Sequence, residues 1–173
     1  MTDPTFFGYG SLVNLKTHDY RQPQRRKIDG WRRVWRSTTL RDFAILSVTP
    51  DHGTTLDGIS AQVPNADWAA LDDREFAYRR QLLPDQTAIY EVQDNIIHPA
   101  DGPHPILRSY LDVVIQGYLR EFGQDGAANF FATTDNWGPI KDDRAAPIYP
   151  RHQVLSPDET RFVDDQISRL VRA

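Results

Sequence analysis

A glycine-containing segment near the start of the chain has the composition of an anion-binding loop. Residues 7–12 read Phe-Gly-Tyr-Gly-Ser-Leu and directly follow an apolar run. Two glycines permit a sharp turn, in which consecutive backbone N–H groups converge on a carboxylate or a developing oxyanion. The segment is not a phosphate loop, because the Gly-Lys-Ser/Thr that such a loop requires does not follow it. Ser11 also lacks the Gly-x-Ser-x-Gly surroundings of a hydrolase nucleophile. By spacing alone, an ordinary strand-to-turn transition with Tyr9 in the core explains the segment as well.

A second candidate is Glu75, which lies in a helix expected over residues 66–76. Trp68, Leu71 and Glu75 fall on one face of that helix at helical spacing. A carboxyl group against apolar side chains is desolvated, which raises its pKa toward the range useful for proton transfer near neutral pH. The alternative is a surface glutamate paired with a nearby arginine such as Arg79.

Composition excludes several other kinds of chemistry. The chain has 173 residues, a net charge of −4 and no cysteine. A disulfide framework, a thiolate nucleophile and a cysteine zinc site are therefore ruled out. Two histidines in a proline-rich loop, His98 and His104, are too few to hold a metal without further ligands. We expect no metal and no cofactor.

Positive charge is concentrated in one stretch. Residues 21–41 contain eight lysines and arginines and one acid, whereas nucleic-acid-binding domains are usually basic overall. The stretch therefore favours a small anionic substrate, or a solvated surface, over nucleic acid. Within it, Trp31 and Trp35 alternate with arginines, as core aromatic residues on a strand do.

The sequence shows no targeting segment and no apolar run of about 18 residues, so we expect a cytoplasmic protein with no membrane partner.

Strand signals dominate the first half of the chain. The expected strands are residues 5–9, 31–36, 43–49, 54–63, 80–83 and 87–93. Pro-Asp-His-Gly at residues 50–53 predicts a hairpin turn between the third and fourth of these strands. Proline-rich segments at 98–105 and around 147–150 indicate loops.

Helix signals dominate the second half. Besides the helix over 66–76, for which Asn65 is a suitable N-cap, a helix is expected over 106–122 and ends at Gly123. A capping box at Ser156 opens a terminal helix. Strands followed by helices indicate an α+β domain rather than a doubly wound sheet, and we expect residues 1–173 to form one domain.

The motifs described above resemble those of the γ-glutamylcyclotransferase-like family. The resemblance rests on residues 7–12, on Asp-Arg-Glu at 73–75 and on Tyr78. Residues 30–35, Gly-Trp-Arg-Arg-Val-Trp, are similar to the strand that follows the glycine loop in these proteins. The match covers residues 5–95.

The resemblance implies a small mixed β-barrel with flanking helices. It also implies that Tyr9, Gly10, Ser11 and Leu12 form the loop that holds a γ-glutamyl group, and that Glu75 is the catalytic acid and base. The implied activity is cofactor-free cyclisation of a small anionic γ-glutamyl compound to 5-oxoproline with release of an amine. Glutathione, a γ-glutamyl amino acid or a γ-glutamylamine would each be such a substrate. The alternative is a non-catalytic ligand-binding module on the same fold.

This reaction needs no nucleophile from the protein, because the α-amine of the substrate attacks its own γ-carbonyl. The protein must hold the substrate curled, move protons and stabilise an oxyanion. Glu75 suits the proton transfer, and the backbone N–H groups of residues 10–12 suit the oxyanion or the α-carboxylate. Arg33 is a further candidate, as a cationic partner for the substrate. An amide hydrolase using the same cavity would instead release free glutamate.

Overall fold

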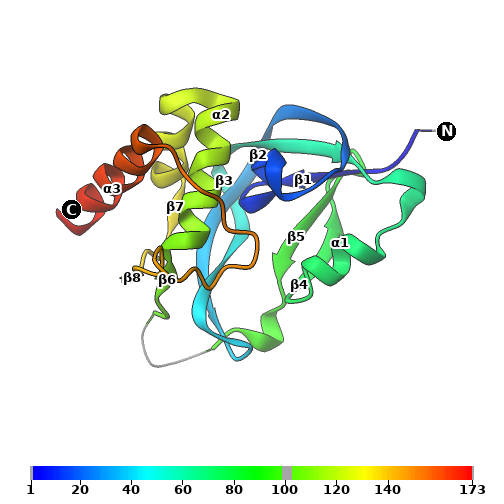
Figure 1. The fold of residues 1–173 in the computed structure, drawn as a ribbon. Helices are drawn as coiled ribbons and strands as arrows, with labels where there is room; N and C mark the ends of the chain where they lie inside the picture. Colours follow the sequence, from blue (N-terminus) through cyan, green and yellow to red (C-terminus); the bar gives the residue numbers. More distant parts are fainter. Residues whose placement is uncertain (1, 99–102, 173) are drawn as a thin grey trace.

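The computed structural model describes residues 2–98 and 103–172 and contains one main sheet with three helices (Figure 1). The main sheet has the order β4-β5-β1-β3-β2-β7. Its strands are β1 (Thr5–Gly8), β2 (Arg21–Thr38), β3 (Arg41–Gln62), β4 (Tyr78–Leu82), β5 (Ala88–Val92) and β7 (Thr134–Asp135). A small parallel sheet consists of β6 (Ile106–Leu107) and β8 (Ile140–Lys141). The helices are α1 (Ala69–Arg74), α2 (Arg108–Ala132) and α3 (Pro157–Arg172).

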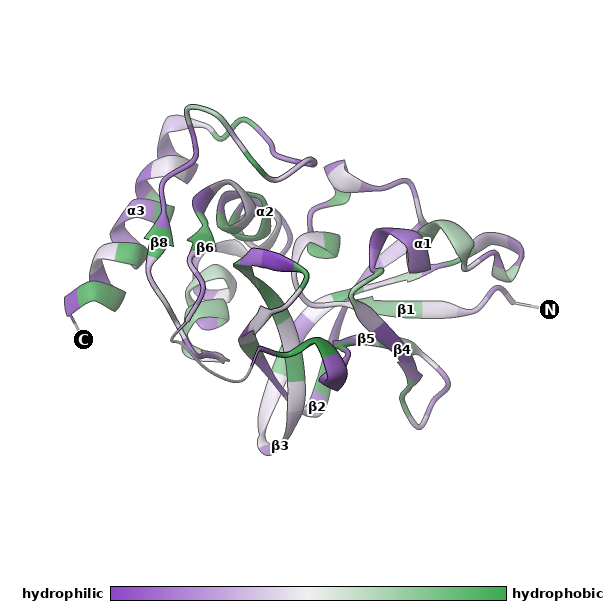
Figure 2. Cartoon of the chain, turned by 90° about the horizontal axis from the view of Figure 1, so that it is seen from below, coloured by the Kyte–Doolittle hydropathy of each residue, from purple (hydrophilic) through white to green (hydrophobic). Residues whose placement is uncertain are grey.

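The expected α+β class is confirmed, but the expected β-barrel is not. In the described part of the chain, β4 and β7 form the two ends of the strand order, so the sheet stays open. It is mixed, since β1 pairs antiparallel with β3 and parallel with β5. Viewed from below, α2 and α3 lie at one end of the molecule, and α1 lies beside β1 and β4 at the other (Figure 2). The larger hydrophobic cluster joins the sheet to α2 and α3, and Trp35 is part of it.

The prediction of a hairpin turn at residues 50–53 is wrong, because the chain does not reverse direction there. Residues on both sides pair with the same antiparallel strand: Pro50 lies opposite Trp31, and Thr55 lies opposite Asp29. The four residues between them bulge out against a single residue of β2. The turn signal is therefore accommodated as a bulge, and β3 continues through it as one 22-residue strand.

Helix α1 is shorter than the helix expected over 66–76. Asn65 has a left-handed φ of 56° within a 3-10 turn, and its N–H donates to the Asp3 carboxylate over 3.0 Å. The expected N-cap role of Asn65 is therefore wrong, and the helix begins at Ala69. Glu75 follows the last helical residue as the C-cap.

The two later helices agree better with the sequence pattern. Gly123, with φ of 73°, interrupts the helical geometry of α2 as expected, but a second helical segment continues to Ala132. The capping box of α3 is confirmed: the Ser156 N–H donates to Glu159 Oε1 (2.8 Å), and the Glu159 N–H donates to Ser156 Oγ (3.2 Å). The loop expected at 98–105 lies partly outside the described residues. No helix in the described part of the chain is long and apolar enough to cross a membrane.

Arg33 is buried in the core, with 1% of its surface exposed. Its Nε donates to the carbonyl of Tyr9 (2.8 Å), its Nη2 to the carbonyl of Asp57 (2.9 Å) and its Nη1 to Thr133 Oγ1 (2.7 Å). The hydroxyl oxygen of Tyr118 lies within hydrogen-bond distance of the same two carbonyls, which share its single proton. Because the guanidinium is bonded inside the protein, the hypothesis that Arg33 is a cationic partner for the substrate is wrong.

Arg33→Met is expected to lower the free energy of unfolding by about 1–3 kcal/mol, because buried carbonyls lose a charged donor. Arg32→Met is the matched control on the opposite face of the same strand. Its ion pair with Asp135 lies at the surface, where the expected loss is below about 1 kcal/mol. Urea unfolding of the two variants and the wild type measures both values, and equal losses would contradict the role given to Arg33.

Candidate active site

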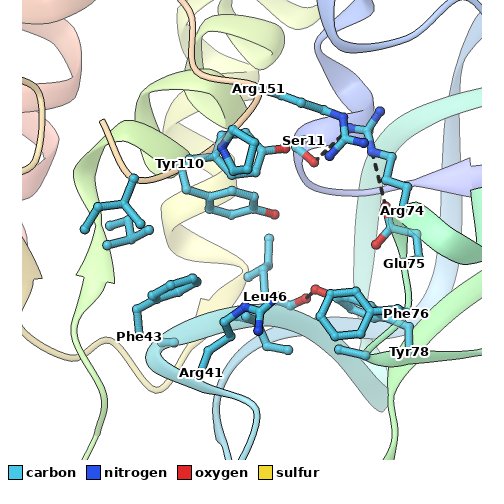
Figure 3. Close-up of a pocket in the computed structure, with 17 residues that line it drawn as sticks. Ser11, Arg41, Phe43, Leu46, Arg74, Glu75, Phe76, Tyr78, Tyr110 and Arg151 are labelled. Carbon is cyan, nitrogen blue, oxygen red and sulfur yellow. Dashed lines mark hydrogen bonds and ion pairs between the residues drawn. The ribbon is translucent and has the colours of Figure 1, made fainter. Parts of the chain in front are cut away.

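A cavity of about 350 Å³ lies where five parts of the chain meet (Figure 3). These are the loop after β1, the first residues of β3, the end of α1 with the turn that follows, the start of α2, and the loop before α3. Its charged lining residues are Arg41, Arg74, Glu75 and Arg151.

The structure brings the five predicted site residues together. Ser11 and Glu75 line the main cavity. A smaller adjoining cavity of about 30 Å³ is lined by both of them and by Tyr9, Gly10 and Leu12. The loop and the carboxyl group, which are more than sixty residues apart in the sequence, therefore border the same space. Their roles in binding and catalysis stay predictions.

Two side chains anchor the loop from the interior. Tyr9 is 6% exposed and its hydroxyl donates to the carbonyl of Tyr90 (2.5 Å), so Tyr9 is a core residue as well as part of the loop. Leu12 packs in the smaller hydrophobic cluster, which lies between the sheet and α1. Between these anchors, Gly10 accepts from the N–H of Val13 (3.0 Å), which closes a 3-10 turn.

Glu75 lies on the wall shared by the two cavities, with 13% of its side chain exposed. Its N–H donates to the carbonyl of Leu71 (2.9 Å), which fixes the backbone at the end of α1. Burial raises the pKa of the Glu75 carboxyl, and the guanidinium groups of Arg74 and Arg151 act against this rise. Arg79 pairs with two other carboxylates, so the alternative in which it pairs with Glu75 is wrong.

Arg74 connects Glu75 to the glycine loop. Its Nε lies 3.5 Å from Glu75 Oε1, and its Nη2 donates to Ser11 Oγ (3.2 Å). Two further bonds reach Thr17, at its carbonyl (2.9 Å) and its hydroxyl (3.0 Å). One nearly buried cation thus holds the carboxyl group and the loop in a common geometry.

Three largely buried tyrosine side chains lie around the two cavities. Burial raises the pKa of Tyr9, Tyr78 and Tyr110, so all three are protonated at neutral pH. The Tyr78 hydroxyl donates to the carbonyl of Leu46 (2.6 Å). Tyr110, from α2, points into the cavity (Figure 3) and lies against the loop, since a Cβ on Gly10 would be 2.8 Å from its hydroxyl oxygen.

Four further polar residues line the cavity, namely Arg41, Tyr110, Tyr149 and Arg151, and the sequence pattern did not mark any of them as part of a site. The sequence places Arg41 in the basic stretch and Tyr110 on the apolar face of a helix. The prolines around 147–150 mark a connection, but they contain no signal that it lies near Glu75. These residues meet only through long-range packing, which spacing along the chain does not reveal.

The cavity can bind a small anion and exchange a proton with it. It offers one mostly buried carboxyl group, three guanidinium groups and the protonated hydroxyl of Tyr110. The rings of His98 and His104 lie 5.7 Å apart. Within residues 2–98 and 103–172, no group of three or more histidine, cysteine, aspartate or glutamate side chains could hold a metal ion.

The structure resembles known proteins, although neither a family model nor a curated protein matches the sequence. A protein described as gamma-glutamyl cyclotransferase superposes with a TM-score of 0.55 at 11% identity, over 94% of this chain and 99% of its own. The human uncharacterized protein loc79017 superposes with a TM-score of 0.57 at 11% identity, over 95% of this chain and 99% of its own. YkqA from Bacillus subtilis superposes with a TM-score of 0.55 at 18% identity, over 79% of this chain and 57% of YkqA.

These comparisons define the fold. The chain has the γ-glutamyl cyclotransferase-like fold over nearly its whole length. The resemblance that rested on residues 7–12, residues 73–75 and Tyr78 is therefore confirmed at the level of the fold.

Gly10→Ala is expected to lower the free energy of unfolding by about 1–3 kcal/mol, the usual cost of overpacking. The new Cβ would lie 2.8 Å from the Tyr110 hydroxyl and 3.1 Å from Leu46 Cδ2. Removing that hydroxyl in Gly10→Ala/Tyr110→Phe should recover part of the loss. A double-mutant cycle by urea unfolding measures the coupling, and strictly additive losses would show that the two residues do not touch.

The raised pKa of Glu75 predicts how stability changes with pH. Its folded-state pKa lies above the unfolded value of about 4.3, so its favourable contribution is complete below that pH and is lost as pH rises through the folded pKa. Glu75→Gln has no carboxyl group to ionise. It should therefore become more stable relative to wild type as pH rises from 4 to 8, as measured by urea unfolding.

Asp135→Asn is a control whose stability relative to wild type should change with pH in the opposite direction. The hydrogen bond from Arg32 lowers the pKa of Asp135, so the contribution of Asp135 is present above its unfolded pKa of about 3.9 and is lost as pH falls. This variant should lose stability relative to wild type as pH rises from 2 to 6. Parallel slopes for the two variants would contradict the buried setting of Glu75.

Proposed function

We propose that this protein is a cofactor-free γ-glutamylcyclotransferase-type enzyme that converts a γ-glutamyl compound to 5-oxoproline and releases an amine. The carrying observation is the Glu75 carboxyl, mostly buried and with a raised pKa, on a cavity wall shared with the loop of residues 9–12. The fold shared with a protein described as gamma-glutamyl cyclotransferase supports the proposal. The substrate would be a small anionic γ-glutamyl compound of the cytoplasm.

In this proposal the substrate supplies its own nucleophile. The nitrogen of its α-amino group bonds to its γ-carbonyl carbon, closing the five-membered ring, and the bond from that carbon to the leaving nitrogen breaks. Two protons pass from the α-ammonium nitrogen to the leaving nitrogen, and Glu75 accepts and returns them one at a time. Water is neither consumed nor released. The protein contributes a curled geometry for attack and a carrier for the protons.

The other groups around the cavity suit the charges of this reaction. Arg74 and Arg151, at the Glu75 end, provide positive charge for the α-carboxylate of the substrate. The N–H groups of residues 10–12 and the hydroxyl of Tyr110 are candidate donors for the oxyanion that forms at the γ-carbonyl. A raised pKa also suits Glu75 to act first as a base and then as an acid, because proton transfer in both directions is efficient when the pKa approaches the working pH.

Glu75→Gln should reduce formation of 5-oxoproline at least about 100-fold, since the proton carrier is lost. Asp73→Asn, at an exposed position near the end of α1, is the matched control and should keep wild-type turnover. Mass spectrometry of 5-oxoproline measures both variants against a panel of glutathione, γ-glutamyl amino acids and γ-glutamylamines. Circular dichroism confirms that each variant is folded.

Three results would contradict the proposal. Wild-type turnover by Glu75→Gln would exclude the mechanism. Free glutamate in place of 5-oxoproline would indicate an amide hydrolase. Ligand-induced thermal stabilisation of the wild type without any product would indicate a binding module.

A further inference from the structure

Positive charge is present at both ends of the main cavity. Arg74 and Arg151 lie at one end, beside Ser11 and Glu75, and Arg41 lies at the opposite end (Figure 3). Arg74 already forms an ion pair with Glu75 and donates a hydrogen bond to Ser11 of the loop. A ligand that spans the cavity therefore meets a second cationic position, away from the proposed reaction centre.

Arg41 is placed to bind an anion. It is the first residue of β3, and its guanidinium carbon lies 4.9 Å from the centre of the Phe76 ring. Its Nη1 donates to the carbonyl of Leu40 (3.0 Å), and within the described residues it forms no ion pair with a carboxylate. A guanidinium has five N–H donors, so donors remain for a ligand.

Part of the cavity wall is apolar, and Phe76 within it lies against Arg41. Phe43, Phe76, Leu107 and Ile148 all line the cavity. Phe76 is 51% exposed and Ile148 is 44% exposed, although both side chains are large and apolar. An apolar ligand group that covers them would remove this surface from water, which favours binding.

We propose that the leaving group of the substrate is an amino acid with a large apolar side chain, and that Arg41 binds its free carboxylate. This inference rests on the proposed function, which sets the γ-glutamyl group at the Glu75 end. The apolar wall then contacts the side chain of the leaving group. A γ-glutamylamine lacks the carboxylate, and glutathione carries it one residue further from the scissile bond.

Three matched compounds test the assignment: γ-glutamyl-phenylalanine, γ-glutamyl-phenylalaninamide and γ-glutamyl-2-phenylethylamine. The wild type should turn over the first with a kcat/KM about tenfold higher than the other two, the size expected for one charge-assisted hydrogen bond. γ-Glutamyl-alanine should also be at least tenfold poorer than γ-glutamyl-phenylalanine, since it leaves the apolar wall uncovered. Equal kcat/KM values for acid and amide would overturn the role of Arg41, and equal values for alanine and phenylalanine would overturn the apolar subsite.

Arg41→Gln should abolish the preference for the acid over the amide, whereas Arg41→Lys should retain part of it. Arg169→Gln, at an exposed position on α3, is the control and should leave the preference unchanged. An acid preference that persists in Arg41→Gln would overturn the inference.

Binding measurements distinguish a failure of this inference from a failure of the proposed function. Titration calorimetry on Glu75→Gln, with Arg41 present or replaced by glutamine, measures the Kd of the acid and the amide without turnover. Product from none of the compounds together with tenfold tighter binding of the acid through Arg41 would refute the enzyme and keep the carboxylate site. Product from all compounds at equal rates and with equal Kd would keep the enzyme and refute the site.

Discussion

The buried guanidinium of Arg33 is the interaction on which the rest of the structure depends. It bonds the carbonyl of Tyr9 at the start of the loop, the carbonyl of Asp57 on β3 and the hydroxyl of Thr133 after α2. A charge this deep in the core requires acceptors on every side, because an unpaired buried charge is strongly destabilising. Strand β2, the loop, β3 and the end of α2 are therefore held in one relative position. The first residue of the glycine loop is therefore held by a contact made in the core.

A second constraint follows from this position of the loop. Once Tyr9 is held, Gly10 is in contact with Tyr110 from α2, and Ser11 accepts from Arg74. Arg74 in turn lies against Glu75, so the loop and the carboxyl group are connected through one cation. The raised pKa of Glu75 shows that burial outweighs the attraction of Arg74 and Arg151. A carboxyl group in this balance takes up and gives up a proton more readily near neutral pH than an exposed glutamate does.

Much of the fold follows from local pattern. The α+β class follows from the order of strand and helix signals along the chain, and strands β4 and β5 and the capping box of α3 depend on neighbours within a few residues. The predictions that were wrong also have physical causes. Pro-Asp-His-Gly at 50–53 has the chemistry of a turn, but continuous pairing of β3 with β2 on both sides converts it into a bulge. Asn65 has the chemistry of an N-cap, but its left-handed backbone and its bond to Asp3 place it in the turn before the helix. Strand order is not encoded locally, which is why an open sheet could not be distinguished from a barrel.

The sequence by itself identified the loop of residues 9–12 and Glu75 as candidates, because glycine content, helical spacing and a motif resemblance can be read locally, but it left the alternatives for both open. Only the tertiary structure showed that these two elements border one cavity. It alone showed that Arg33 is committed to the core, whereas Arg41, Tyr110 and Arg151 line the site. An arginine in a strand has the same local pattern whether its guanidinium meets carbonyls in the interior or an open cavity. The choice between these depends on which distant segments pack against it, and packing is decided by the whole chain.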